Sequence, residues 1–135
     1  MNDTLEISAA STIELINLNL ACLIDIRQPF ELELEGEIAT AIPLPLFQFK
    51  QSLGHALNET EQELLDADLP SPQDTQHFLQ LINKLHYAQD CILICMCNSG
   101  RRSLHAAQLF RELGYQRTFS LHGGYRMLQS ILNPA

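Results

Sequence analysis

Basic residues are scarce in this 135-residue chain: Lys and Arg together number 8, against 16 Asp and Glu, which gives a formal net charge of −8. Proteins that bind nucleic acid through its phosphates need clustered basic side chains, so we expect no nucleic-acid partner. No stretch approaches the ~18 apolar residues of a membrane helix. The polar, acidic first six residues also lack the pattern of a secretory signal. We therefore expect no membrane partner and a cytoplasmic location.

A regular cysteine framework is also lacking. The chain has four cysteines, Cys22, Cys91, Cys95 and Cys97, and three of them fall within seven residues. In a reducing compartment such thiols stay free. The short apolar runs that hold them are typical of buried strands, and we interpret Cys22 and Cys91 as core residues.

Short apolar runs alternate with helix-like periodic runs along the chain. The clearest strand candidates are 21–26, 91–96 and 118–121, and a helix is indicated over 103–113 by apolar residues at i, i+3, i+4 and i+7. This alternation predicts an α/β domain with a parallel sheet. The length fits a single domain over residues 1–135.

The segment from about 47 to 90 is long and acidic. Ser71-Pro72 resembles a helix start, and Phe78, Leu81 and Leu85 lie on one face of the helix that would follow. We expect a helical insert here, since bare loops of this length are uncommon. It would cover a site or bind a partner.

The residues Cys97 to Ser103 (CNSGRRS) directly follow the clearest central strand. Open α/β sheets bind ligands at the carboxyl ends of their strands. A short loop with a glycine can point several N–H groups inward, and the next helix adds partial positive charge. With Arg101 and Arg102 close by, such a field favours a thiolate on Cys97, which is the nucleophile of sulfur exchange.

Residues 97–103 resemble the active-site loop of the rhodanese family: Cys, two residues, Gly, one residue, Arg, then Ser or Thr. Further motifs of that family match in the same order, and together they cover nearly the whole chain. They are Asp25 and Arg27 with Pro29 and Glu31 downstream, a degraded second motif over 38–45, and Gly123-Gly124 before the last helix.

The resemblance implies the rhodanese-like α/β fold, a central parallel sheet of about five strands flanked by helices. It implies a sulfurtransferase in which Cys97 takes sulfane sulfur from a small anionic donor of the thiosulfate or persulfide type. The persulfide then passes its sulfur to cyanide, a thiol or a protein acceptor. No metal or organic cofactor is needed.

The resemblance also assigns roles to residues around Cys97. The backbone amides of the six loop residues Asn98, Ser99, Gly100, Arg101, Arg102 and Ser103 would cradle the persulfide. Arg101 and Arg102 would bind the donor. A buried carboxylate needs a partner, so we expect Asp25 to accept N–H bonds from the loop or helix start and Arg27 to pair with Glu31.

Some positions depart from the family pattern. Glu37 stands where the family usually has His, Ala39-Thr40 replaces Pro-Gly, and Leu128 replaces a common Trp. Four residues separate Cys97 from Arg102, one fewer than in the phosphatases and arsenate reductases of this fold. The shorter loop suits a sulfur atom better than a phosphate.

Three other functions stay open. The chain could be a non-catalytic binding module that acts through the acidic insert, or a phosphatase or arsenate reductase on the same fold. It could also be a thiol-disulfide oxidoreductase that uses Cys95 with Cys97. A metal site built from Cys95, Cys97, His105 and His122 fits no zinc spacing. His122 could line the mouth of the pocket.

Overall fold

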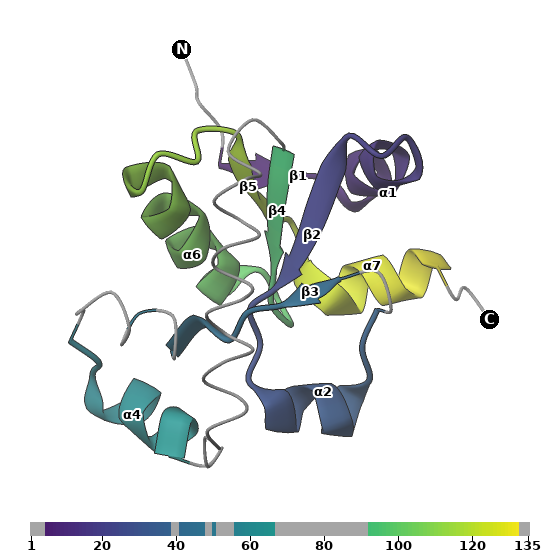
Figure 1. The fold of residues 1–135 in the computed structure, drawn as a ribbon. Helices are drawn as coiled ribbons and strands as arrows, with labels where there is room; N and C mark the ends of the chain where they lie inside the picture. The colour runs from purple at the N-terminus through teal and green to yellow at the C-terminus, as the bar shows by residue number, and fades with distance from the viewer. Residues whose placement is uncertain (1–4, 39–40, 48–49, 51–55, 67–91, 133–135) are drawn as a thin grey trace.

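The computed structural model describes residues 5–38, 41–47, 50, 56–66 and 92–132 (Figure 1). The described elements, in chain order, are β1 (Glu6–Ile7), α1 (Ala9–Asn17), β2 (Ala21–Asp25), α2 (Pro29–Glu35), β3 (Ile42–Pro43), α4 (Glu59–Asp66), β4 (Ile92–Met96), α6 (Arg101–Glu112), β5 (Thr118–Leu121) and α7 (Gly124–Leu132).

The strands form one five-stranded sheet in the order β1-β5-β4-β2-β3, and every pairing is parallel. β4 lies at its centre. The predicted parallel α/β fold is therefore confirmed. Since the strands are parallel, the carboxyl ends of β2, β3, β4 and β5 lie on the same side of the sheet, and such sheets bind ligands at that side.

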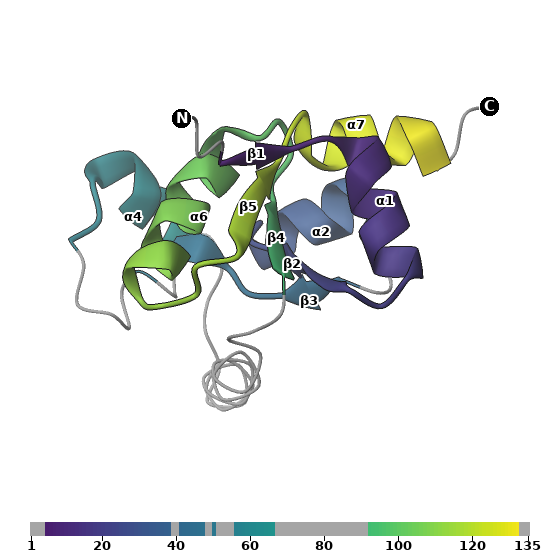
Figure 2. The same ribbon diagram turned by 90° about the horizontal axis from the view of Figure 1, so that it is seen from above.

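The two faces of the sheet are covered by different helices (Figure 2). On β4, Leu93 and Cys95 pack in an apolar cluster with Ala106 and Phe110 of α6. The alternate residues of β4 pack on the other face with α1 and α7. Alternation of side chains along a strand that is buried on both sides produces this three-layer arrangement.

The helix ends follow from local chemistry. Ser8 caps α1 by accepting a hydrogen bond from the Ser11 N–H at 3.1 Å. Pro29 occupies the first turn of α2, and the Gln28 N–H donates to Glu31 Oε1 at 3.0 Å. α6 ends before Gly114, whose φ of 108° is the left-handed conformation expected there.

The predicted insert over 47–90 is described only in part. Within it α4 is helical and follows a reciprocal cap between Asn58 and Glu61. The helix expected from Ser71, and Cys91, lie outside the described residues.

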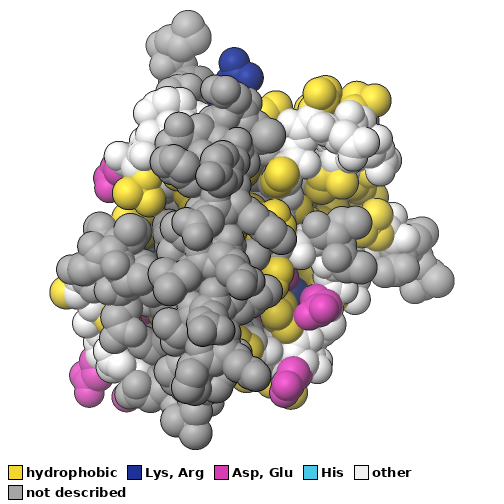
Figure 3. All heavy atoms as spheres, in the orientation of Figure 1, with side chains coloured by type: hydrophobic (Ala, Val, Ile, Leu, Met, Phe, Trp, Pro, Cys, Tyr) yellow, Lys and Arg dark blue, Asp and Glu magenta, His cyan; other side chains and the backbone are white. Residues whose placement is uncertain are grey.

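The exposed surface is uneven in character. Apolar side chains gather at the upper right of Figure 3, over α1, where Leu18 and Leu20 are exposed. Acidic side chains show at the lower edge, over α2 and α4. No helix among the described residues is long and apolar enough to cross a membrane.

Candidate active site

Cys97 is the first residue after β4 and is only 1% exposed. α6 begins at Arg101, two residues earlier than the predicted start at Ser103. Gly100 joins loop and helix with φ of 99°, and a Cβ there would lie 3.3 Å from Gly123 N and Leu121 O. The loop is tight enough that glycine suits both the conformation and the space.

The Sγ atom of Cys97 lies in a cradle of hydrogen-bond donors. It accepts from the Gly100 N–H at 3.0 Å and from the Ser103 N–H at 3.4 Å, and Ser103 Oγ lies 3.5 Å away. Both amides belong to the start of α6, where the helix dipole favours negative charge. The cradle can therefore stabilise a sulfur anion in a place shielded from water.

Ser120, on β5, extends this cradle and was missed by the sequence analysis. Its Oγ lies 2.7 Å from Ser103 Oγ, and both side chains are fully buried. With Ser120 Oγ–H donating to Ser103, the single Ser103 O–H can donate either to Gly100 O, 3.1 Å away, or to a sulfur anion on Cys97, 3.5 Å away. A polar serine inside an otherwise apolar strand could have marked Ser120 as a functional residue. The sequence does not show that β5 pairs with β4, which is what brings Ser120 close to the loop after β4.

Glu31 of α2 reaches across to the loop and pairs with Arg102. The two guanidinium nitrogens lie 2.7 and 2.5 Å from its carboxylate oxygens, and Asn98 Nδ2 donates to it at 2.9 Å. Burial alone would raise the pKa of Glu31, but the Arg102 and Gln28 hydrogen bonds and nearby charges outweigh it and lower that pKa. The bidentate pair fixes Arg102 at the start of α6.

Arg27 and Asp25 form a second, deeper ion pair. Asp25 accepts from Arg27 Nε at 3.0 Å and from a terminal guanidinium nitrogen at 2.8 Å, and both side chains are at most 2% exposed. The expected pairing of Arg27 with Glu31 is thus wrong: Glu31 binds Arg102 and Asn98. The backbone N–H that Asp25 accepts, at 3.2 Å, is that of Arg27 and not one from the loop or a helix start, where we expected its donors.

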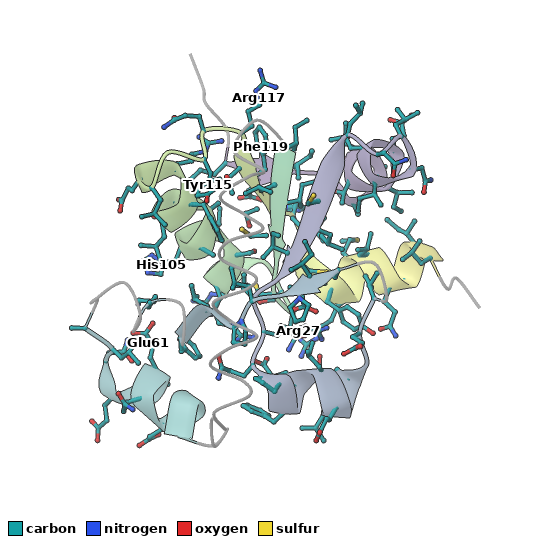
Figure 4. All side chains as sticks on the ribbon, viewed as in Figure 1. Arg27, Glu61, His105, Tyr115, Arg117 and Phe119 are labelled. Carbon is teal, nitrogen blue, oxygen red and sulfur yellow. The ribbon has the colours of Figure 1, made fainter. Side chains whose placement is uncertain are left out.

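The guanidinium of Arg27 joins three parts of the site (Figure 4). It donates to Asn98 Oδ1 at 3.2 Å and to Gly36 O at 3.0 Å, and it lies 4.1 Å from the centre of the Tyr125 ring. Burial alone would lower the pKa of Arg27, but the hydrogen bond and charge of Asp25 outweigh it and raise that pKa. Removing either partner would leave a buried charge, at a cost of about 3–5 kcal/mol.

The predicted turn Gly123-Gly124 lies against the loop. A Cβ on Gly124 would lie 2.4 Å from Cys97 O and 2.6 Å from Asn98 O. This close approach lets the Tyr125 N–H donate to Cys97 O at 2.6 Å and the Arg126 N–H donate to Asn98 O at 3.3 Å. The start of α7 therefore fixes the backbone that carries Cys97.

Arg101 and Ser99 face outward, unlike their neighbours. Both are exposed, and among the described residues Arg101 has no ionic partner. A pocket of about 320 Å³ opens beside Arg101 and Arg102. Its other walls are Leu46 and Phe47, Asn58 and Thr60, and Glu61 with His105. Figure 4 shows Glu61 and His105 facing each other from α4 and α6.

Cys95 and His122 have surroundings that differ from that of Cys97. Cys95 is fully buried, and burial, followed by the nearby Cys97, raises the pKa of its thiol above the usual range. A thiol held in this way is a poor resolving group.

His122, which we expected at the mouth of the pocket, is not among the residues that line the pocket beside Arg101. Its Nδ1 lies 2.6 Å from Glu6 on β1, and its side chain is 68% exposed.

Comparison with known proteins gives one family. The family model of the rhodanese-like domain matches residues 8–130. No curated protein matches the chain.

Solved structures resemble the chain over nearly its whole length. The human single-domain sulfurtransferase TSTD1 is 26% identical, with a TM-score of 0.60 over 92% of this chain and 94% of that one. The Saccharomyces cerevisiae single-domain sulfurtransferase RDL2 is 21% identical, with a TM-score of 0.59 over 97% and 93%. A Rhodopseudomonas palustris protein described as a possible tyrosine phosphatase is also 21% identical, with a TM-score of 0.58 over 95% and 80%.

Proposed function

The chain belongs to the rhodanese-like domain family, and we propose that it is a sulfurtransferase that carries sulfane sulfur as a persulfide on Cys97. The observation that supports this best is the cradle around Sγ, with amide donors from Gly100 and Ser103 at 3.0 and 3.4 Å. Its donors are placed for an anionic sulfur. The likeness to TSTD1, a single-domain sulfurtransferase, points the same way.

The proposed reaction has two displacement steps. The Cys97 thiolate attacks the outer sulfur of a donor such as thiosulfate, a new S–S bond forms, and sulfite leaves with the electron pair of the broken S–S bond. An acceptor such as cyanide or a thiol then attacks the outer sulfur of the persulfide. Cys97 leaves as the thiolate, so the site returns to its starting state without an added oxidant or reductant.

The surrounding residues would act on the charge of these sulfur atoms. The N–H groups of Gly100 and Ser103 would hold the thiolate anion at Sγ, and they need no rearrangement for this because α6 fixes them. Arg102 adds positive charge next to the site while Glu31 holds it in place. Asp25 and Arg27 act through the Asn98 side chain as positioning residues.

A phosphatase is the second candidate, because a structural neighbour is described as a possible tyrosine phosphatase. The loop argues against it. Only four residues separate Cys97 from Arg102, and both guanidinium ends that would grip a phosphate are bound to Glu31.

Intact mass spectrometry after incubation with thiosulfate tests the proposal. We expect the wild-type protein to gain one sulfur atom, which cyanide removes, and the Cys97→Ser variant to gain none. Cys95→Ser is the matched control and should gain the sulfur like the wild type. If neither thiosulfate nor a polysulfide adds sulfur to the wild type, the sulfurtransferase proposal fails and the non-catalytic binding module gains support.

A further inference from the structure

The side chain of Asn98, the residue after Cys97, lies between Arg27 and Glu31. Its Oδ1 accepts a hydrogen bond from Arg27 Nη1 at 3.2 Å, and its Nδ2 donates to Glu31 Oε2 at 2.9 Å. The sequence predicted a direct ion pair between Arg27 and Glu31, but each of them is paired with another residue. The amide of Asn98 bridges the two side chains where that ion pair was expected.

Each partner of Asn98 belongs to a separate ion pair. Arg27 is paired with Asp25 at 2.8 Å, and Glu31 is paired with Arg102 at 2.5 Å. Figure 4 shows Arg27 between the strand ends and α2. Asn98 therefore connects the two pairs, and the connected side chains come from the end of β2, from α2, from the loop after β4 and from the start of α6.

The amide of Asn98 fits these partners in one orientation. A guanidinium only donates and a carboxylate only accepts, so the amide oxygen must face Arg27 and the amide nitrogen must face Glu31. Asn98→Asp would keep the size of the side chain, but it would replace the donor that faces Glu31 by a second carboxylate oxygen. Asn98→Ala would remove both bonds.

The backbone next to this side chain is held by the start of α7. Asn98 O accepts from the Arg126 N–H at 3.3 Å, and Cys97 O accepts from the Tyr125 N–H at 2.6 Å. Two residues after Asn98, the Gly100 N–H donates to Cys97 Sγ at 3.0 Å. Because the spacing is so short, a change in the conformation of Asn98 would also move this donor.

We propose that the Asn98 side chain is a positioning residue for sulfur transfer, a role that rests on the sulfurtransferase function proposed above. By joining the two ion pairs, it holds the loop so that the Gly100 and Ser103 amides face Sγ before a donor arrives. Aligned donors stabilise the reacting charge without reorganisation, so the role acts on the chemical step more than on donor binding. Asn98 itself exchanges no proton or electron with the sulfur atoms.

The test is single-turnover persulfide formation on the full chain, followed by the release of sulfite from thiosulfate. We expect Asn98→Ala to lower the saturating rate about tenfold or more, and to change the half-saturating thiosulfate concentration less than about threefold. Gln116→Ala is the matched control. It removes another side-chain amide, which donates to Arg111 O at 3.2 Å beyond the other end of α6, and it should keep the wild-type rate.

Asn98→Asp adds a pH readout, which a loss of stability alone would not produce. The titratable and charged groups around the new carboxyl are those of Asp25, Arg27, Glu31, Arg102 and Tyr125. Near pH 8 the new carboxylate repels Glu31, so the variant should be slow. Toward pH 5 it takes up a proton and can donate to Glu31 again. The rate relative to wild type should therefore rise at least about threefold.

Gln116→Glu is the control for that pH profile, because it adds a carboxylate away from the loop, and its rate relative to wild type should stay constant. A saturating rate for Asn98→Ala within about twofold of wild type overturns the positioning role. A rate ratio for Asn98→Asp that does not change with pH also overturns it, and in both cases the sulfurtransferase function stands. Absence of a persulfide on wild-type Cys97 with thiosulfate and with polysulfide overturns both proposals.

Discussion

Two buried thiols, two residues apart on one face of the sheet, have opposite surroundings. Cys95 lies inside β4, fully buried among apolar side chains, and its pKa is raised by that burial and then by Cys97. Cys97 is just as buried, but it lies one residue beyond the strand, where Gly100 and Ser103 direct hydrogen-bond donors at Sγ. Burial therefore does not decide whether a cysteine can react; the donors available at the end of the strand do.

The first prediction compares the loss of each of the two thiols, and it has the largest expected effect. Cys97→Ser abolishes sulfur transfer to cyanide, because it removes the thiol that lies in the cradle of donors from Gly100 and Ser103. Cys95→Ser leaves transfer near the wild-type rate, since the Cys95 thiol stays protonated in its apolar site. Thiocyanate formation measures both. Loss of transfer in Cys95→Ser, in a variant that still folds, would instead support disulfide cycling between the two cysteines.

The second prediction removes the support beneath Cys97. Gly124→Ala places a Cβ 2.4 Å from Cys97 O at a φ of 65°, so the loop and the start of α7 must move apart. We expect a loss of about 2–4 kcal/mol in the free energy of unfolding and a loss of most transfer activity. Urea unfolding and the cyanide assay measure the two effects.

Gly114→Ala is the matched control for that change. Gly114 also has a positive φ, 108°, but nothing lies within 4 Å of the Cβ position. It should cost about 1 kcal/mol and leave the transfer rate intact, because the strain is far from the loop. Equal losses in both variants would mean that backbone conformation, rather than contact with Cys97, makes Gly124 necessary.

The sequence predicted the parallel sheet, the helix after Cys97 and the glycine turn because each depends on local patterns. The apolar run that became β4 and the helical spacing of apolar residues in α6 are examples. It predicted the wrong partner for Arg27 and no ionic partner for Arg102. Asp25 and Glu31 are both within reach of Arg27 along the chain, and only the position of α2 against the loop decides that Glu31 turns to Arg102.

The role of Ser120 could not be predicted from the sequence either, because it also depends on a contact between distant segments. Its hydroxyl contacts Ser103, 17 positions away, only because β5 pairs with β4. The individual roles of the loop residues stay predictions. The proposed insert stays a prediction as well, because most of 47–90 lies outside the described residues.

The third prediction tests whether the Ser120 hydroxyl supports the cradle around Cys97 through its contact with Ser103. Ser120→Ala removes the hydroxyl that holds Ser103, so we expect persulfide formation to slow about tenfold while stability falls by only about 1 kcal/mol. Thr118→Val is the control on the same strand: it removes a buried hydrogen bond to Tyr115 O, costs similar stability, and leaves the rate unchanged. Equal rate losses in both variants would assign Ser120 a purely structural role.

The fourth prediction concerns the ion pair between Glu31 of α2 and Arg102 at the start of α6, and it has the smallest expected effect. Glu31 has a lowered pKa in the folded protein, so its contribution to stability is fully present above the unfolded value of 4.5. It is lost as the pH falls from there through the lowered folded value. Unfolding curves between pH 6 and 3 should therefore converge for wild type and Glu31→Gln in acid and separate near neutrality. Glu63→Gln, at an exposed carboxylate of α4, should follow the wild type throughout. If Glu31→Gln keeps the wild-type pH dependence, the charge of Glu31 is not what fixes Arg102, and its hydrogen bonds suffice.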